Sequence, residues 1–118
     1  MNRSWIRWGS FFMLTGVLAG AFGAHALKNV LSDPMKAVYE TAVRYQLIHG
    51  LALFIIAWIS TVSTKRSVRV SGIAFCVGIF LFSGSLYLLA LTGIRAFGMM
   101  TPLGGLAFLV GWGCLVSF

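Results

Sequence analysis

Four long stretches of this 118-residue chain contain no Asp, Glu, Lys or Arg. A helix needs about 20 mainly apolar residues to cross a hydrocarbon core of about 30 Å. A transmembrane β-barrel would instead show alternating segments of about 10 residues. The pattern therefore predicts an all-α, polytopic membrane protein, a compact bundle of four transmembrane helices. The stretches cover residues 8–27, 45–64, 70–94 and 96–118, and are 20, 20, 25 and 23 residues long.

The composition excludes the main alternatives to a membrane protein. Apolar residues make up 59% of the chain and charged residues only 9%, whereas soluble domains have about 45–50% and about 25%. A soluble domain of this size exposes too much of its surface to hide so many apolar side chains. Disorder requires low hydrophobicity and high net charge, so it is excluded as well.

Helix boundaries follow from the stretches and from two proline-containing starts. In Ser32-Asp33-Pro34, Asp33 is a candidate N-cap and Pro34 suits the first helical position; Thr101-Pro102 repeats this arrangement. One domain spanning residues 1–118 is expected, with helices over about 8–26, 34–62, 68–91 and 101–118.

The second expected helix is longer than a bilayer core. Its 29 residues span about 43 Å at about 1.5 Å per residue. We expect this helix to extend beyond the bilayer at its N-terminal end. The first three turns, with Lys36, Glu40 and Arg44, are then outside the hydrocarbon or at its surface.

Basic residues near the helix ends predict the orientation of the bundle. With four spans, both chain ends and the loop between helices 2 and 3 share one side. That side holds five basic residues and the other side four, which favours cytoplasmic N- and C-termini. The net charge of +7 indicates attraction to anionic membrane lipids rather than to nucleic acid, because the basic residues flank the spans. The five are Arg3, Arg7, Lys65, Arg66 and Arg69, and the four are Lys28, Lys36, Arg44 and Arg95.

Glycines recur at helical spacing in the first and fourth expected helices. Membrane helices associate where small residues let their backbones approach closely. These positions fit either packing within the chain or an interface between copies in a homo-oligomer, and both can hold on different faces. The glycines are Gly16, Gly20, Gly23, Gly104 and Gly111.

Six polar residues form a candidate cluster near the outer ends of helices 1 and 2. Polar side chains at membrane depth are costly and tend to be functional. Glu40 and Arg44 have the i, i+4 spacing of a helix ion pair. Tyr45, Gln46 and His49 lie on a second face of the same helix. This face could contact His25 at the end of helix 1. The six are His25, Glu40, Arg44, Tyr45, Gln46 and His49.

The cluster has three interpretations. It can tie helix 1 to helix 2, it can bind a ligand or ion near the outer face, or His25 and His49 can hold a haem iron as axial ligands. Zinc is disfavoured because no third histidine or thiolate lies nearby, and no metal site or cofactor is expected. Nucleophilic or paired-carboxylate catalysis has no support, since Asp33 and Glu40 are the only acids. The chain is therefore not expected to be an enzyme.

Several motifs resemble one family over nearly the whole chain. They are Gly20–His25, Tyr39–His49, Gly84-Ser85-Leu86-Tyr87 and Thr101–Gly105 followed by Gly111-Trp112. Their order and spacing are similar to those of the domain-of-unknown-function family 423, small bacterial inner-membrane proteins. The resemblance implies four helices and a location in the bacterial inner (plasma) membrane, and it implies no established activity.

Three functional hypotheses follow. The first is a non-enzymatic membrane assembly or accessory protein that acts through helix–helix contacts, as a homo-oligomer and with an unidentified protein partner. The alternative is a binding or carrier protein for a lipid, ion or small solute that uses the polar cluster. The third and least favoured is a haem-binding electron carrier.

Overall fold

The computed structural model, which describes residues 3–118, confirms an all-α fold with four membrane-length helices. The first is α1 (Arg3–His25) and the second is α2 (Asp33–Ile59). The third runs over Arg66–Thr92 as α3 (Arg66–Gly78), one π-helical turn η1 (Ile79–Ser83) and α4 (Gly84–Thr92). The fourth consists of a 3₁₀ turn η2 (Arg95–Met99) and α5 (Thr101–Val116).

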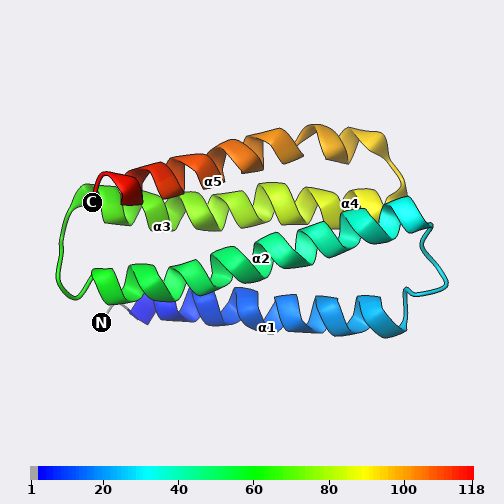
Figure 1. Ribbon diagram of the computed structural model, residues 1–118, viewed down its shortest axis with the longest axis horizontal. Coiled ribbons are helices and arrows are strands. Elements are labelled where there is room, and N and C mark those ends of the chain that lie inside the picture. The colour runs from blue at the N-terminus through cyan, green and yellow to red at the C-terminus, as the bar shows by residue number, and fades with distance from the viewer. Residues whose placement is uncertain (1–2) are drawn as a thin grey trace.

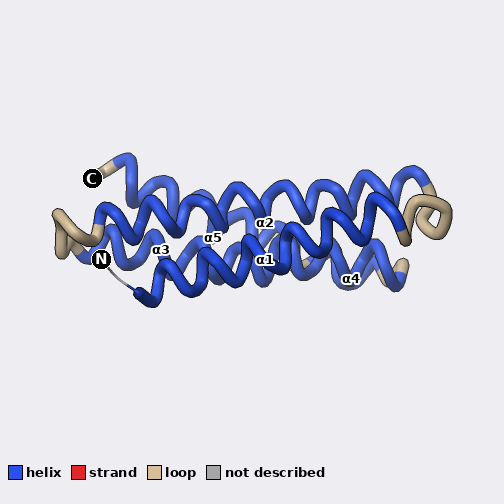
Figure 2. Tube along the Cα trace, turned by 90° about the horizontal axis from the view of Figure 1, so that it is seen from below, coloured by secondary structure: helices blue, strands red, loops and turns tan. Residues whose placement is uncertain are grey.

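The four helices run side by side along an elongated bundle of 47 × 26 × 17 Å (Figures 1 and 2). The start of α1, the C-terminus and the α2–α3 turn lie at one end, which we call the terminal end (Figure 1). The α1–α2 connector and residues 93–100 lie at the other, which we call the opposite end (Figure 1). In the most apolar part of α2, 44% of the residues are buried, and in that of the third helix 39% are buried. In α1 and in the fourth helix the share of buried residues is 17% each. The second and third helices therefore form the centre of the bundle.

The start of α2 differs by one residue from the expected cap. Ser32, rather than Asp33, is the N-cap: its backbone is extended, and its Oγ accepts a hydrogen bond from the backbone N–H of Met35 at 3.3 Å. Pro34 still lies within the first two helical positions, where its missing N–H costs nothing. At the start of α5, Thr101 caps no backbone group, and its hydroxyl instead pairs with that of Ser85 at 2.6 Å.

The helix bounds differ from the expected ones where polar residues flank an apolar run. α1 begins at Arg3 rather than at residue 8, because a helix can continue through charged residues beyond the hydrocarbon. α2 ends at Ile59 because residues 60–62 form a turn. The π-helical turn in the third helix was not expected, and it lies where the Ser83 hydroxyl donates to the Ala42 carbonyl on α2 at 2.7 Å.

All five glycines singled out in the sequence lie at contacts between helices of this chain. Gly16, Gly20 and Gly23 face Leu47, Val43 and the ring of Tyr39 on α2. Gly111 faces the ring of Phe75 on α3. The closest approach is at Gly104, where an added Cβ would overlap the backbone nitrogen of Phe82 and lie 2.7 Å from its Cα.

The core is apolar and so is the outer surface of the bundle. Phe12, Leu53 and Phe75 are among the fully buried core side chains. Leu18 on α1 and Leu109 on α5 are exposed to 62% and 68%, and such large apolar side chains are stable at a surface only if lipid covers it. The two cysteines, Cys76 and Cys114, are free thiols and half-buried.

The Phe82 contact makes Gly104 the glycine least tolerant of a side chain. We expect Gly104→Ala to lower the free energy of unfolding in mixed micelles by about 1–3 kcal/mol, because backbone cannot move aside as a side chain can. Gly113→Ala is the matched control on the same helix, since a Cβ there meets nothing within 4 Å. Equal stability of the two variants would contradict the close packing of α5 against η1.

Candidate functional site

The depth of each α2 residue can be read from its contacts with the neighbouring helices. Gly16 of α1 faces Leu47, and Gly20 faces Val43, so Arg44 lies level with residues 17–19. The charge-free stretch of α1, residues 8–27, has its midpoint between Val17 and Leu18. Arg44 therefore lies at the middle of the span that α1 defines.

The other two helices give the same depth. The ring of Tyr45 lies 4.5 Å from that of Phe82, centroid to centroid, and 6.2 Å from that of Phe108. Phe82 is the midpoint of the charge-free stretch 70–94, and Ala107 is the midpoint of 96–118. The charge-free stretch of α2 alone is displaced, by about ten residues, toward the terminal end.

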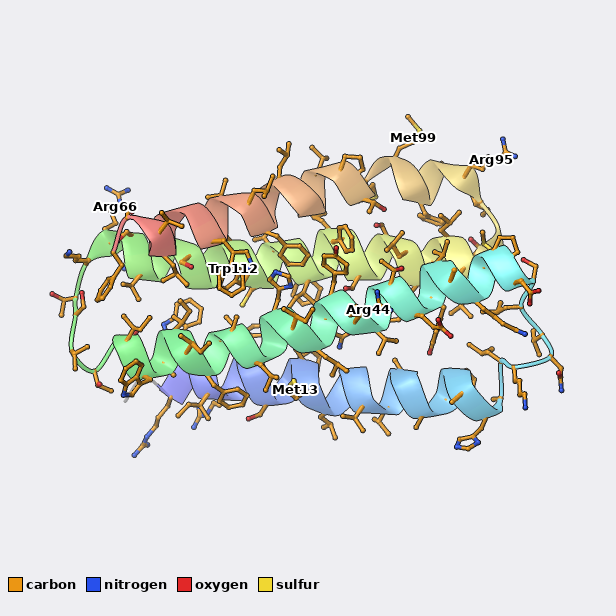
Figure 3. The ribbon with its side chains drawn as sticks, viewed as in Figure 1. Met13, Arg44, Arg66, Arg95, Met99 and Trp112 are labelled. Carbon is orange, nitrogen blue, oxygen red and sulfur yellow. The ribbon has the colours of Figure 1, made fainter. Side chains whose placement is uncertain are left out.

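The packing of α2 on α1 indicates a deeper position for Glu40 and Arg44 than the expected one. Both lie within the length of α1, because Tyr39 already packs against Gly23 of α1. Only about the first turn of α2 extends past the level of α1's last apolar residues. Figure 3 places Arg44 well inside both ends of the bundle, whereas Arg66 and Arg95 lie at the ends.

The expected ion pair between Glu40 and Arg44 is also absent. Among residues 3–118, the one ion pair within 4.0 Å joins Lys36 and Asp33. Glu40 and Arg44 are both exposed and both line a groove of about 350 Å³ between α1 and α2. The groove residues are Gly20, Gly23, Ala24, Tyr39, Glu40, Val43, Arg44 and Leu47.

Gln46 joins three helices through its side-chain amide. Its Nε2 donates to the Phe12 carbonyl at 2.9 Å and to the Thr15 hydroxyl at 2.8 Å, both on α1. Its Oε1 accepts from the Tyr87 hydroxyl on α4 at 2.7 Å. With 5% of its surface exposed, Gln46 links α1 to the centre of the bundle.

His49 forms a second, separate polar centre on the side of α5. Trp112 Nε1 donates to His49 Nε2 at 3.0 Å, so Nε2 carries no proton, and Nδ1 donates to the Tyr45 carbonyl at 2.8 Å. The imidazole stacks on Phe108 with a centroid distance of 3.6 Å and an interplanar angle of 9°. Figure 3 shows Trp112 at this position on α5. The geometry is that of a neutral histidine with both ring nitrogens engaged.

His25 does not join this cluster, contrary to expectation. It is the last residue of α1, exposed at the opposite end, while His49 is 3% exposed and lies beyond the middle of the bundle. The separation of these two residues does not support the least favoured hypothesis, in which His25 and His49 together hold a haem iron. Within residues 3–118, no group of three or more His, Cys, Asp or Glu side chains could hold a metal ion.

A cleft of about 400 Å³ opens beside the Gln46 centre, between α1, α2 and the third helix. Its walls are mainly apolar, and its polar groups come from Gln46, Tyr87, Tyr39, Thr15 and Ser83. The Tyr39 hydroxyl donates to the Ala19 carbonyl at 2.5 Å. None of the residues that line the cleft is charged: Phe11, Phe12, Thr15, Ala19, Phe22, Tyr39, Gln46, Ile79, Phe80, Ser83, Gly84, Tyr87 and Leu91.

Thr15, Ser83, Tyr87 and Trp112 were missed as candidate site residues. A signal was present, because Thr15 and Ser83 are polar residues near the middle of charge-free stretches. Their hydrogen-bond partners could not be identified from the sequence, because each hydrogen bond joins residues 31 to 63 positions apart in the chain.

Comparison with known proteins places the chain in a family. The family described as "Protein of unknown function (DUF423)" matches residues 19–105. The chain belongs to this family. It is 48% identical to a UPF0382 membrane protein of Staphylococcus haemolyticus, over 92% of this chain and 88% of that protein. It is 43% identical to the UPF0382 membrane protein YwdK of Bacillus subtilis, over 88% of this chain and 85% of that protein. No solved structure matches the chain.

The hydrogen bond between Gln46 and Tyr87 can be measured with a double-mutant cycle. We expect Gln46→Leu and Tyr87→Phe to show a coupling of about 0.6–1.7 kcal/mol in the free energy of unfolding, the range for hydrogen bonds between membrane helices. A control cycle pairs Gln46→Leu with Thr41→Val, because the Thr41 hydroxyl bonds only to its own helix. If both cycles give the same coupling, Gln46 does not link α2 to α4.

Proposed function

We propose that this protein binds the hydrocarbon chain of an uncharged amphiphile in the cleft between α1, α2 and the third helix, without chemical change to it. The observation that carries the proposal is a lateral opening of about 400 Å³ whose lining holds no charged side chain. A charged ligand would leave its charge uncompensated there, which is costly.

The position of the cleft suits a lipid chain. Along α1 the lining runs from Phe11 to Phe22, which is about 16 Å at about 1.5 Å per residue. This is about half of a hydrocarbon core of about 30 Å. A chain entering from the leaflet at the opposite end would fill it to the level of Phe12 and Phe80, whose rings lie 5.4 Å apart.

The polar groups of the cleft favour a ligand that donates a hydrogen bond. The Tyr39 hydroxyl already donates its hydrogen bond to the Ala19 carbonyl, and the Tyr87 hydroxyl donates to Gln46 Oε1. Each phenolic oxygen still has acceptor capacity. A long-chain alcohol or an acylglycerol has both the apolar chain and the hydroxyl donor that this arrangement can receive.

The same observations support a binding role rather than catalysis. The lining of the cleft holds no cysteine, histidine, lysine or carboxylate that could serve as a nucleophile or base. The glycines that suggested assembly into a homo-oligomer lie at contacts inside the chain. Lipid binding is therefore favoured over an assembly role.

We also propose a cytoplasmic location for the terminal end, in a bacterial plasma membrane. Because Arg44 lies within the span, it is not counted among the basic residues that flank the helices. Five basic residues at the terminal end then stand against three at the opposite end, Lys28, Lys36 and Arg95. This larger difference supports cytoplasmic termini by the positive-inside rule.

Filling the cleft tests the proposed function. Gly84 lines the cleft, and a Cβ there meets nothing within 4 Å, so Gly84→Leu should occupy the cleft without disturbing the fold. With the protein in bilayers, a long-chain alcohol bearing a diazirine should crosslink to cleft residues of the wild type. We expect at least about a fivefold loss of this labelling in Gly84→Leu, since the leucine takes the space of the chain.

Gly113→Leu is the matched control. Its Cβ also meets nothing within 4 Å, but Gly113 is exposed on α5, away from the cleft. It should label like the wild type. Unchanged labelling in Gly84→Leu, or labelling spread evenly over the exposed faces of α1 and α5, would overturn the proposal.

A further inference from the structure

Arg44 is a charged group at the middle of the span that α1 defines, with no ion-pair partner within 4.0 Å among residues 3–118. An arginine keeps its charge in proteins, and a charge at the bilayer centre costs about 2.5–3.5 kcal/mol or more. Gln46 and His49, at nearly the same depth, have hydrogen-bond partners on neighbouring helices, and His49 also bonds to the Tyr45 carbonyl of its own helix. Arg44 differs from them because its charge is left to be balanced by something outside the protein.

The groove around Arg44 leads toward the opposite end of the bundle. Side chains on a helix tilt toward its N-terminus, and for α2 this direction is the opposite end. Gly20, Gly23 and Ala24 form the α1 wall, so no large side chain of α1 obstructs the guanidinium. Apart from Tyr39, no residue lines both this groove and the cleft.

Glu40 lies in the same groove, one turn nearer the opposite end. Four residues of helix separate it from Arg44, about 6 Å along the axis. Moving outward from the bilayer centre, a molecule in the groove therefore meets a positive charge first and a negative charge second. In the part of the chain that the structure describes, neither charge has an ion-pair partner within 4.0 Å.

We infer that this groove binds the headgroup of a phospholipid that carries a phosphate followed by a primary ammonium group. In such a lipid the phosphate lies next to the chains and the ammonium lies further out, the order that complements Arg44 and Glu40. Because headgroups otherwise lie outside the hydrocarbon core, a lipid bound here is displaced inward along the groove. Guanidinium binds phosphate with two parallel hydrogen bonds. A primary ammonium donates hydrogen bonds to a carboxylate, which a quaternary ammonium cannot do. One zwitterionic headgroup balances both charges.

This site is distinct from the cleft in chemistry and in place. The cleft lining carries no charge and takes an uncharged chain, whereas the groove presents one charge of each sign. Gly84 lines only the cleft, and Glu40 and Arg44 line only the groove, so the variants at these positions test the two proposals separately.

Competition between lipids with matched chains tests the inference. The full-length protein is reconstituted in bilayers of phosphatidylethanolamine, phosphatidylcholine, phosphatidylglycerol and diacylglycerol, and retained lipids are counted by native mass spectrometry. We expect enrichment of phosphatidylethanolamine over the other three. Arg44→Gln should lower its enrichment over diacylglycerol by about tenfold, the effect of one charge-assisted pair. Glu40→Gln should abolish the preference for phosphatidylethanolamine over phosphatidylglycerol.

Two controls separate a lipid site from other partners of Arg44. Arg95→Gln removes an exposed arginine at the opposite end and should leave the enrichment unchanged. The double variant Glu40→Arg with Arg44→Glu keeps both charges but reverses their order in depth. This variant should lose the enrichment of phosphatidylethanolamine if binding depends on the order of the phosphate and ammonium sites along the groove.

Three results would overturn the inference. Retention of the enrichment by Arg44→Gln would show that the arginine does not hold the phosphate. Its retention by the charge-reversed variant would mean that Glu40 and Arg44 only balance each other. A dimer that is lost in Arg44→Gln and restored in the charge-reversed variant would assign Arg44 to Glu40 of a second copy of the chain.

Discussion

Hydrocarbon offers no hydrogen-bond partners, so each polar group at membrane depth must be satisfied by the protein or by a bound molecule. In this bundle the constraint falls mainly on α2, which carries Arg44, Gln46 and His49 within two turns near the middle of the span. Gln46 binds α1 and α4, and His49 accepts a hydrogen bond from Trp112 on α5. These two residues hold the outer helices to α2, whereas Arg44 is left facing the surface.

The same constraint explains where space remains in the bundle. α1 packs mainly on α2, through Gly16, Gly20 and Gly23, and openings remain on both sides of that contact. On one side the lining of the uncharged cleft includes Tyr39 and Tyr87, and on the other the groove holds Glu40 and Arg44. The bundle thus combines a hydrogen-bonded polar centre with two openings, one without charged side chains and one with a charge of each sign.

The number of helices could be predicted because each charge-free stretch corresponds to one helix. The stretches do not determine how far one helix is shifted along its axis relative to another. α2 shows the consequence: its stretch begins at Tyr45, yet Tyr45 packs against Phe82 at the middle of the third helix. Gln46 and His49 were identified as polar residues at depth, but their partners Tyr87 and Trp112 come from other helices and could not be assigned from spacing. The π-helical turn at Ile79–Ser83 has no sequence signal that we recognise.

The depth of α2 in the bilayer is the central claim, and nitroxide labels test it directly. Ile48 lies one turn beyond Arg44 and Leu14 lies at about the same level on α1; both are exposed, at 47% and 62%. Labels at these two positions should lie within about 5 Å of the bilayer mid-plane, with high accessibility to oxygen and low accessibility to a water-soluble nickel chelate. A label at Ile48 that the chelate reaches as easily as one at Lys36 would place Arg44 at the membrane surface and contradict the account.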